Sequence, residues 1–352
     1  MGEIVKEERY TNLDGLRAIA SVGIVMMHVL ANVGCSVEEF VFVELIPSFT
    51  QLVFLFMIIS CFSMCCGYFE QVSKGTISPN EFYSKRFAKI WPFFALLTAA
   101  ELIVSPSIET LYEAFANLTL CFGLLPNHKI EVVGVGWTLG VIFVFYLMFP
   151  FVCFLLSNRR RAWFALIVAV LFNWVCKAYF FDEEHMLLDY ARRTNILYCS
   201  MYFLAGGMIY LYRDQLVIIA SRFRKTIVLL IIAITICYYM WLENEYVLLL
   251  LYSVVLIYVI GLKSMPSVLN NKVVCLMGKY SMEVYLSHMF IYRVIEKLDA
   301  YKLFDSYILS YFTTVLLTYL GALLFAFVVR QCFKKLSFIK GKLTCFLNTK
   351  AR

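Results

Sequence analysis

Charged residues are scarce in this sequence. They make up 16% of the 352 residues, whereas 62% are hydrophobic, a balance far from that of a soluble globular domain. Internal repeats, low-complexity segments and a stretch with soluble-domain composition are also lacking. The composition predicts an all-α, polytopic integral membrane protein. We expect one membrane domain over residues 1–345 and a short cytoplasmic tail at 346–352.

Metal-binding patterns and basic clusters are lacking as well. The twelve cysteines are spread through apolar segments, and the densest group, Cys61, Cys65 and Cys66, has no histidine or acidic residue at metal-ligand spacing. We therefore expect small core side chains and no metal. The net charge of +7 is not gathered into a basic patch, so it indicates membrane topology and no nucleic-acid partner.

Ten apolar runs are long enough, or nearly so, to cross a bilayer. They cover residues 13–33, 46–66, 90–105, 137–156, 162–180, 195–212, 226–241, 246–262, 280–296 and 307–329. Ten spans place both termini in the cytoplasm and most Lys and Arg residues on the inner side, as the positive-inside rule requires. The exceptions are Arg17, within the first run, and the outer residues Lys129, Lys177, Arg192, Arg193, Arg293, Lys297 and Lys302.

A further apolar stretch, residues 111–125, leaves a choice. Counting it as a span would send the loop with Arg159, Arg160 and Arg161 to the outer side, against the positive-inside rule. We therefore expect this stretch to be re-entrant or interfacial.

The first run, LDGLRAIASVGIVMMHVLANV, carries three ionisable residues in a segment where each is costly. On a helix, Arg17 and His28 share one face about 16 Å apart along the axis, with Asp14 within about 60° of that face. An intramembrane histidine indicates a functional site. Asp14 is too far away to orient His28, so we expect it to cap the helix or orient Arg17, while another helix supplies any partner of His28. The alternative is interfacial anchoring by Asp14 and Arg17 and a structural hydrogen bond from His28.

This run resembles the first-helix signature of the type 3 membrane acyltransferase family, in which a cation precedes a histidine by the spacing seen between Arg17 and His28. Four later stretches resemble further elements of that family in order and spacing: FYSKRFAKIWPFF (82–94), WTLGVIFVFYLMFP (137–150), YFLAGGMIY (202–210) and MGKYSMEVYLSH (277–288). Together the matches cover most of the chain.

Three positions depart from the family pattern. Lys89 stands where a second arginine is common, so the charge is kept but the bidentate fork is lost. Cys61 replaces a glycine in a Ser-Gly-Phe element. Ile142 stands where a glutamate is frequent, and no acid function is expected there.

The resemblance implies a multi-pass O-acyltransferase of the cell membrane. Such enzymes usually move acetyl from cytoplasmic acetyl-coenzyme A to a hydroxyl of an extracytoplasmic polysaccharide or an undecaprenyl-type lipid-linked sugar. We expect Arg17, Arg86 and Lys89 to pair with the donor phosphates and His28 to act as the base. Direct transfer and an acyl-histidine intermediate both remain open.

The remaining candidate residues have supporting roles. Asp14 and His288 join His28 in the expected catalytic group, where His288 positions substrate, stabilises an oxyanion or is simply structural. Trp137, Tyr146 and Tyr285 are expected to line the substrate path, and the alternative for the first two is packing at the span ends.

Two other functions stay open. A transporter or flippase of lipid-linked sugars or acyl donors would not need a base in line with an inner cationic site, and a non-catalytic scaffold would not bind the donor. The expected partners are acetyl-coenzyme A, the glycan acceptor and the lipid bilayer, with a homodimer left open.

Overall fold

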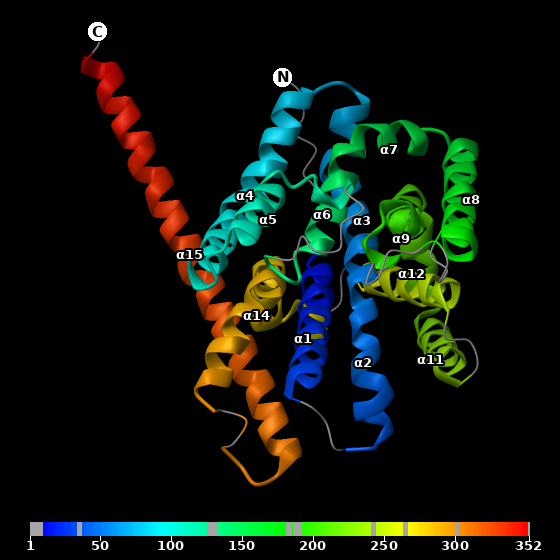
Figure 1. The fold of residues 1–352 in the computed structure, drawn as a ribbon. Coiled ribbons are helices and arrows are strands. Elements are labelled where there is room, and N and C mark those ends of the chain that lie inside the picture. The colour runs from blue at the N-terminus through cyan, green and yellow to red at the C-terminus, as the bar shows by residue number, and fades with distance from the viewer. Residues whose placement is uncertain are drawn as a thin grey trace. The chain divides into compact units, whose positions relative to one another are not determined.

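A computed structural model describes residues 10–33, 37–124, 132–180, 185, 192–240, 244–262, 267–299, 301 and 303–350, with side chains as far as residue 336. Within these ranges every regular element is a helix (Figure 1). The α-helices are α1 (Asn12–Val33), α2 (Ile46–Ser48), α3 (Leu52–Ser73), α4 (Pro79–Val104), α5 (Ile108–Leu118), α6 (Trp137–Leu147), α7 (Phe149–Leu156), α8 (Arg159–Val175), α9 (Ile196–Leu211), α10 (Arg213–Arg222), α11 (Arg224–Met240), α12 (Glu245–Gly261), α13 (Lys272–Lys279), α14 (Ser281–Lys297) and α15 (Tyr307–Lys350). The π-helices are η1 (Val41–Leu45) and η4 (Cys176–Phe180), and the 3₁₀ turns are η2 (Phe49–Gln51), η3 (Phe122–Leu124), η5 (Arg192–Thr194) and η6 (Val268–Asn270).

The all-α prediction is confirmed, but the count of ten spans is confirmed only in part. Among the described residues, five helical stretches are long and apolar enough to cross a membrane: α1, η1 to α3, α4, α8 with η4, and α15. The number rises to seven if each of two bent pairs, α6 with α7 and α9 with α10, makes one span. The three other predicted runs coincide with α11, α12 and α14, which have only 17 residues each. That is the lower limit of spanning length, and the cytoplasmic placement of both termini stays a prediction.

The stretch at 111–125 does not form a spanning helix in its described part. It contains the end of α5, an 11-residue helix that is about 16 Å long, roughly half the thickness of the bilayer core. The indole nitrogen of Trp91 in α4 donates to the carbonyl of Leu118 at 3.0 Å, and α5 runs beside α4 in Figure 1. Its length agrees with the expected re-entrant or interfacial segment.

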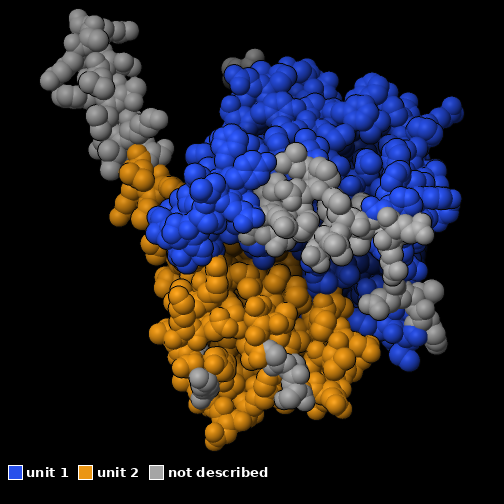
Figure 2. All heavy atoms as spheres, in the orientation of Figure 1, with its two compact units in different colours: residues 1–20, 49–278 blue, residues 21–48, 279–352 orange. Residues whose placement is uncertain are grey.

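The described chain divides into two compact units, each assembled from two separated segments (Figure 2). Unit 1 contains residues 1–20 and 49–278, and unit 2 contains residues 21–48 and 279–352. The boundary at Ala20 falls inside the continuous helix α1, which therefore contributes to both units.

In unit 1, α9 packs tightly against α3. A Cβ atom added to Gly206 would lie 2.0 Å from the carbonyl oxygen of Ile58, and one added to Gly207 would lie 3.3 Å from the sulfur of Cys61. Such close backbone approach through small residues is typical of membrane helices. The glycine pair of YFLAGGMIY thus serves helix packing, and Cys61 is a small buried side chain as expected.

Unit 2 is held together by polar contacts between α1 and α15. The Tyr311 hydroxyl donates to the carbonyl of Met26 at 2.9 Å, and the hydroxyls of Ser21 and Tyr319 are 3.2 Å apart. Tyr311 is fully buried. These contacts fix the second half of α1, which carries His28.

Candidate functional site

The structure pairs His28 with His288. His28 lies in the second half of α1, His288 lies in α14, and their ring centroids are 4.9 Å apart with the ring planes tilted by 55°. His288 is fully buried, whereas His28 is partly exposed. The sequence predicts that another helix supplies any orienting partner of His28. Another helix does supply the neighbouring imidazole, but the hydrogen bond that orients the His28 ring comes from Ile24 of α1 itself.

Backbone carbonyls hold both rings in the same tautomer. Nδ1 of His28 is 3.0 Å from the carbonyl oxygen of Ile24, and Nδ1 of His288 is 2.6 Å from that of Tyr285. A carbonyl can only accept, so each neutral ring carries its proton on Nδ1 and its lone pair on Nε2. Both rings therefore present Nε2 as the basic atom. Within the described residues, Nε2 of His288 is buried without a hydrogen-bond partner.

Tyr285 belongs to the same group. Its ring centroid lies 6.0 Å from that of His288, and its carbonyl accepts the Nδ1 hydrogen bond. The expected proximity of these two residues is therefore present.

In unit 1, two of the predicted donor-binding cations contact one helix, α3. Arg17 donates to Asp14 at 3.0 Å and to the hydroxyl of Ser63 at 2.6 Å. Arg86, from α4, donates to the hydroxyl of Tyr68 at 2.5 Å and lies 4.4 Å from the centre of that ring. Ser63 and Tyr68 are about 7.5 Å apart along a helix axis. The expected orientation of Arg17 by Asp14 is present in this arrangement.

Tyr146 reaches the same helix from α6. Its hydroxyl is 2.9 Å from that of Ser60. Ser60, Ser63, Met64 and Tyr68 form what we call the polar face of α3, which α1, α4 and α6 contact through Arg17, Arg86 and Tyr146.

The sequence reasoning missed Ser63 and Tyr68. The available signal was that they follow Ser60 by three and eight residues within an otherwise apolar run. Lys89, one turn after Arg86 in α4, is exposed, and its role toward the donor stays a prediction.

The glycines of two motifs lie where backbones meet. A Cβ atom on Gly15 would be 2.1 Å from the carbonyl oxygen of Leu269, and one on Gly278 would be 1.7 Å from that of Asp14. The LDG element thus packs against η6 on one side and against the MGK element on the other. This packing fixes the start of α1 and hence the position of Asp14 and Arg17.

Comparison with known proteins agrees with these motifs. A family model described as an acyltransferase domain matches residues 10–330. The chain belongs to the acyltransferase 3 family. It is also similar to "Protein 2 in picA locus" of Rhizobium radiobacter, with 33% identity over 92 residues. That match covers 26% of this chain and 44% of the relative, less than half of either. No solved structure matches.

In this member of the acyltransferase 3 family, the three predicted substrate-binding aromatic residues lie in different surroundings. Tyr146 contacts the polar face of α3, and Tyr285 lies beside His288. Trp137 begins α6, where the guanidinium of Arg193 lies 5.2 Å from the centre of its ring. Arg193 was not among the predicted site residues, and it also lines a pocket of unit 1.

Proposed function

We propose that this membrane acyltransferase is an O-acetyltransferase that moves acetyl from cytoplasmic acetyl-coenzyme A to a hydroxyl of an extracytoplasmic polysaccharide or lipid-linked sugar. Its base is His28. The observation that carries the proposal is the pair of imidazoles, His28 and His288, whose Nδ1 atoms are held by backbone carbonyls so that each can present Nε2 as a base.

The chemistry follows from the position of the lone pair. Nε2 of His28 accepts the proton of the acceptor hydroxyl while that oxygen attacks the thioester carbon. The carbon–sulfur bond then breaks, the ester forms, and coenzyme A leaves as a thiolate that takes the proton back from the imidazolium. Positioned proton transfer of this kind contributes about 10²- to 10⁴-fold to the rate.

Arg17 and Arg86 are assigned to the anionic end of the donor. Each is already held at a defined place on α3, Arg17 by Ser63 and Arg86 by Tyr68, so little side-chain entropy remains to be lost when phosphate binds. Guanidinium groups suit phosphate because they offer paired donors. The helix that carries Arg17 also carries His28.

A labelled-donor assay tests the proposal. The full-length protein, purified in detergent, is incubated with acetyl-coenzyme A that carries radiolabel in the acetyl group, with surface glycan or lipid-linked sugar as acceptor. We expect label on the acceptor and release of free thiol. We expect His28→Ala to abolish this acceptor-dependent labelling. Labelling at the normal rate in His28→Ala would refute the role of His28. Absence of labelling in the native protein with every acceptor, together with transport of lipid-linked sugar, would support a transporter.

A further inference from the structure

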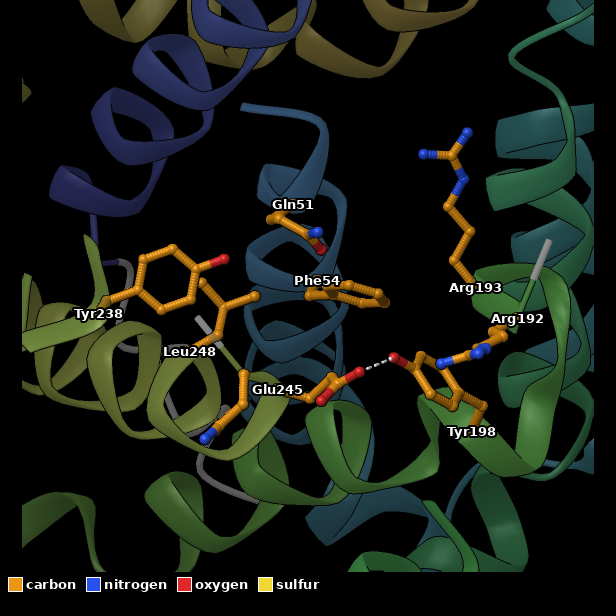
Figure 3. Close-up of a pocket in the computed structure, with 9 residues that line it drawn as sticks. Gln51, Phe54, Arg192, Arg193, Tyr198, Tyr238, Glu245 and Leu248 are labelled. Carbon is orange, nitrogen blue, oxygen red and sulfur yellow. Dashed lines mark hydrogen bonds between the residues drawn. The ribbon is translucent and has the colours of Figure 1, made fainter. Parts of the chain in front are cut away.

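An open pocket of about 430 Å³ lies in unit 1 (Figure 3). It is lined by Gln51, Phe54, Arg192, Arg193, Tyr198, Tyr238, Asn244, Glu245 and Leu248. Its volume lies within the usual range of small-ligand sites. The proposed function does not use any of these residues.

The pocket has an apolar and aromatic base. Phe54, Tyr198, Tyr238 and Leu248 are all buried, and Phe54 is stacked on Tyr202 with ring centroids 4.2 Å apart. Figure 3 shows these side chains around one space, together with the amide of Gln51. Rigid aromatic surface with a few polar groups at its edge is typical of ligand sites, and it suits the ring of a sugar.

The acid in the pocket is already engaged. One carboxylate oxygen of Glu245 accepts from Lys177 at 2.8 Å and the other from the hydroxyl of Tyr198 at 2.8 Å. Burial raises the pKa of Glu245, but the hydrogen bonds from Lys177, its own backbone and Tyr198 outweigh burial and bring the pKa below its usual value. Glu245 is therefore ionised, its negative charge is balanced by Lys177, and it holds the Tyr198 hydroxyl in place. It leaves little uncompensated negative charge to act on a ligand.

The two arginines are not neutralised in this way. Arg193 donates to the hydroxyl of Thr50 at 2.7 Å and lies over Trp137, neither of which carries charge. Arg192 is half-buried, and among the described residues its guanidinium makes no hydrogen bond or ion pair. In Figure 3 the two side chains diverge from the same turn. A partly desolvated guanidinium is costly without an anion, so the pocket favours an anionic ligand.

The pocket and the donor-binding cations lie toward opposite ends of α3. Phe54 is in the first turn of this helix, and Ser63 and Tyr68 follow about 13 and 21 Å further along the axis. The distribution of charge along the sequence predicts that Lys177, Arg192 and Arg193 are extracytoplasmic. The pocket is therefore placed on the side from which an extracytoplasmic acceptor would enter.

We propose that this pocket binds an anionic sugar residue of the acceptor. The sugar ring packs on the aromatic base, and its carboxylate or phosphate pairs with Arg192, with Arg193 held nearby by Thr50 and Trp137. The inference rests on the proposed function in that the bound glycan is the acceptor of the transfer.

Binding measurements on the full-length protein test this proposal. Dissociation constants are measured by calorimetry for four probes: a hexuronate oligosaccharide, a neutral hexose oligosaccharide of the same length, an isoprenyl diphosphate sugar and coenzyme A. We expect at least one anionic sugar to bind more tightly than the neutral one. Arg192→Gln should weaken that binding about tenfold or more, because it removes a charge-assisted hydrogen bond. Dependence of the hexuronate on Arg192 identifies a carboxylate, and dependence of the diphosphate sugar alone identifies a phosphate.

Three further variants control the experiment. Arg192→Lys keeps the charge and should retain part of the affinity. The comparison of the two variants separates loss of the charge from misfolding of Arg192→Gln. Arg160→Gln makes the same change at an exposed position of α8 and should have no effect. His28→Ala should abolish transfer but keep glycan binding.

The proposal is overturned if neutral and anionic glycans bind equally, if Arg192→Gln binds like the native protein, or if Arg192→Gln loses coenzyme A instead of glycan. Failure of the proposed function has a different signature. In that case glycan binding depends on Arg192, but no transfer that depends on His28 is detected with any acceptor.

Discussion

The imidazole rings of His28 and His288 lie 4.9 Å apart, and each donates through Nδ1 to a carbonyl of its own helix. The two acceptor carbonyls, of Ile24 and Tyr285, belong to residues four and three positions earlier. Each ring is thus held by local helix geometry, while packing of α14 on α1 sets the distance between the rings.

Replacement of His288 distinguishes a chemical role from a packing role. Asparagine retains a donor near the position of Nδ1, so it can still reach the carbonyl of Tyr285, but it lacks the Nε2 lone pair. If His288 acts through Nε2, His288→Asn lowers kcat by about tenfold or more with little change in the KM for the donor. Normal kcat in His288→Asn would mean that the residue only supports α14.

Removal of the cations on α3 should weaken donor binding. Arg17→Gln and Arg86→Gln are each expected to raise the KM for acetyl-coenzyme A about tenfold or more, because each loses a charge-assisted phosphate contact. Lys85→Gln is the matched control, since Lys85 is an exposed cation paired with Glu81 on the same helix as Arg86. If all three variants had the KM of the native protein, the donor would bind elsewhere.

Gly278 should tolerate no side chain. A Cβ atom there would meet the backbone of Asp14, which cannot move aside without shifting α1. Gly278→Ala is expected to destabilise the protein by about 1–3 kcal/mol or more, measured as a lower Tm in detergent. Gly134→Ala is the control, because a Cβ atom at Gly134 would meet nothing within 4 Å. An unchanged Tm for Gly278→Ala would argue against this packing.

The ion pair between Glu283 and Arg330 should stabilise unit 2. Glu283 is only 1% exposed, and Arg330 donates to one of its carboxylate oxygens from Nε at 2.6 Å. Arg330→Met leaves a buried carboxylate unpaired, which costs about 3–5 kcal/mol and should lower the Tm by several degrees. Combining it with Glu283→Gln should restore part of the loss, whereas Lys334→Met, at an exposed position one turn later, should have little effect. Equal Tm values for Arg330→Met and Lys334→Met would contradict the role of the pair.

Much of the fold could be predicted because membrane helices are encoded locally. Each of the ten apolar runs coincides with helix, since hydrophobic length and backbone hydrogen bonding act within one segment. The span count was less predictable. The bends of 57° between α6 and α7 and 80° between α9 and α10 depend on what these helices pack against.

For the candidate site, too, some features follow from the sequence and others depend on how the helices pack. The types of residue and their helical spacing, such as Arg17 and His28 on one face, follow from the sequence because a helix has fixed geometry. Their partners do not follow from it: Ser63 lies 46 residues from Arg17, and Glu245 lies 68 residues from Lys177.

The sequence by itself determined an all-helical membrane chain, the acyltransferase motifs and the ionisable residues of α1, because all of these are properties of continuous segments. Only the tertiary structure decided that His288 lies beside His28, that Arg17 and Arg86 both hydrogen-bond side chains of α3, and that Arg192 lines a pocket whose acid is already paired. Those relationships join side chains from segments that are far apart in the sequence. Their hydrogen bonds and ion pairs therefore form only when the helices pack against one another.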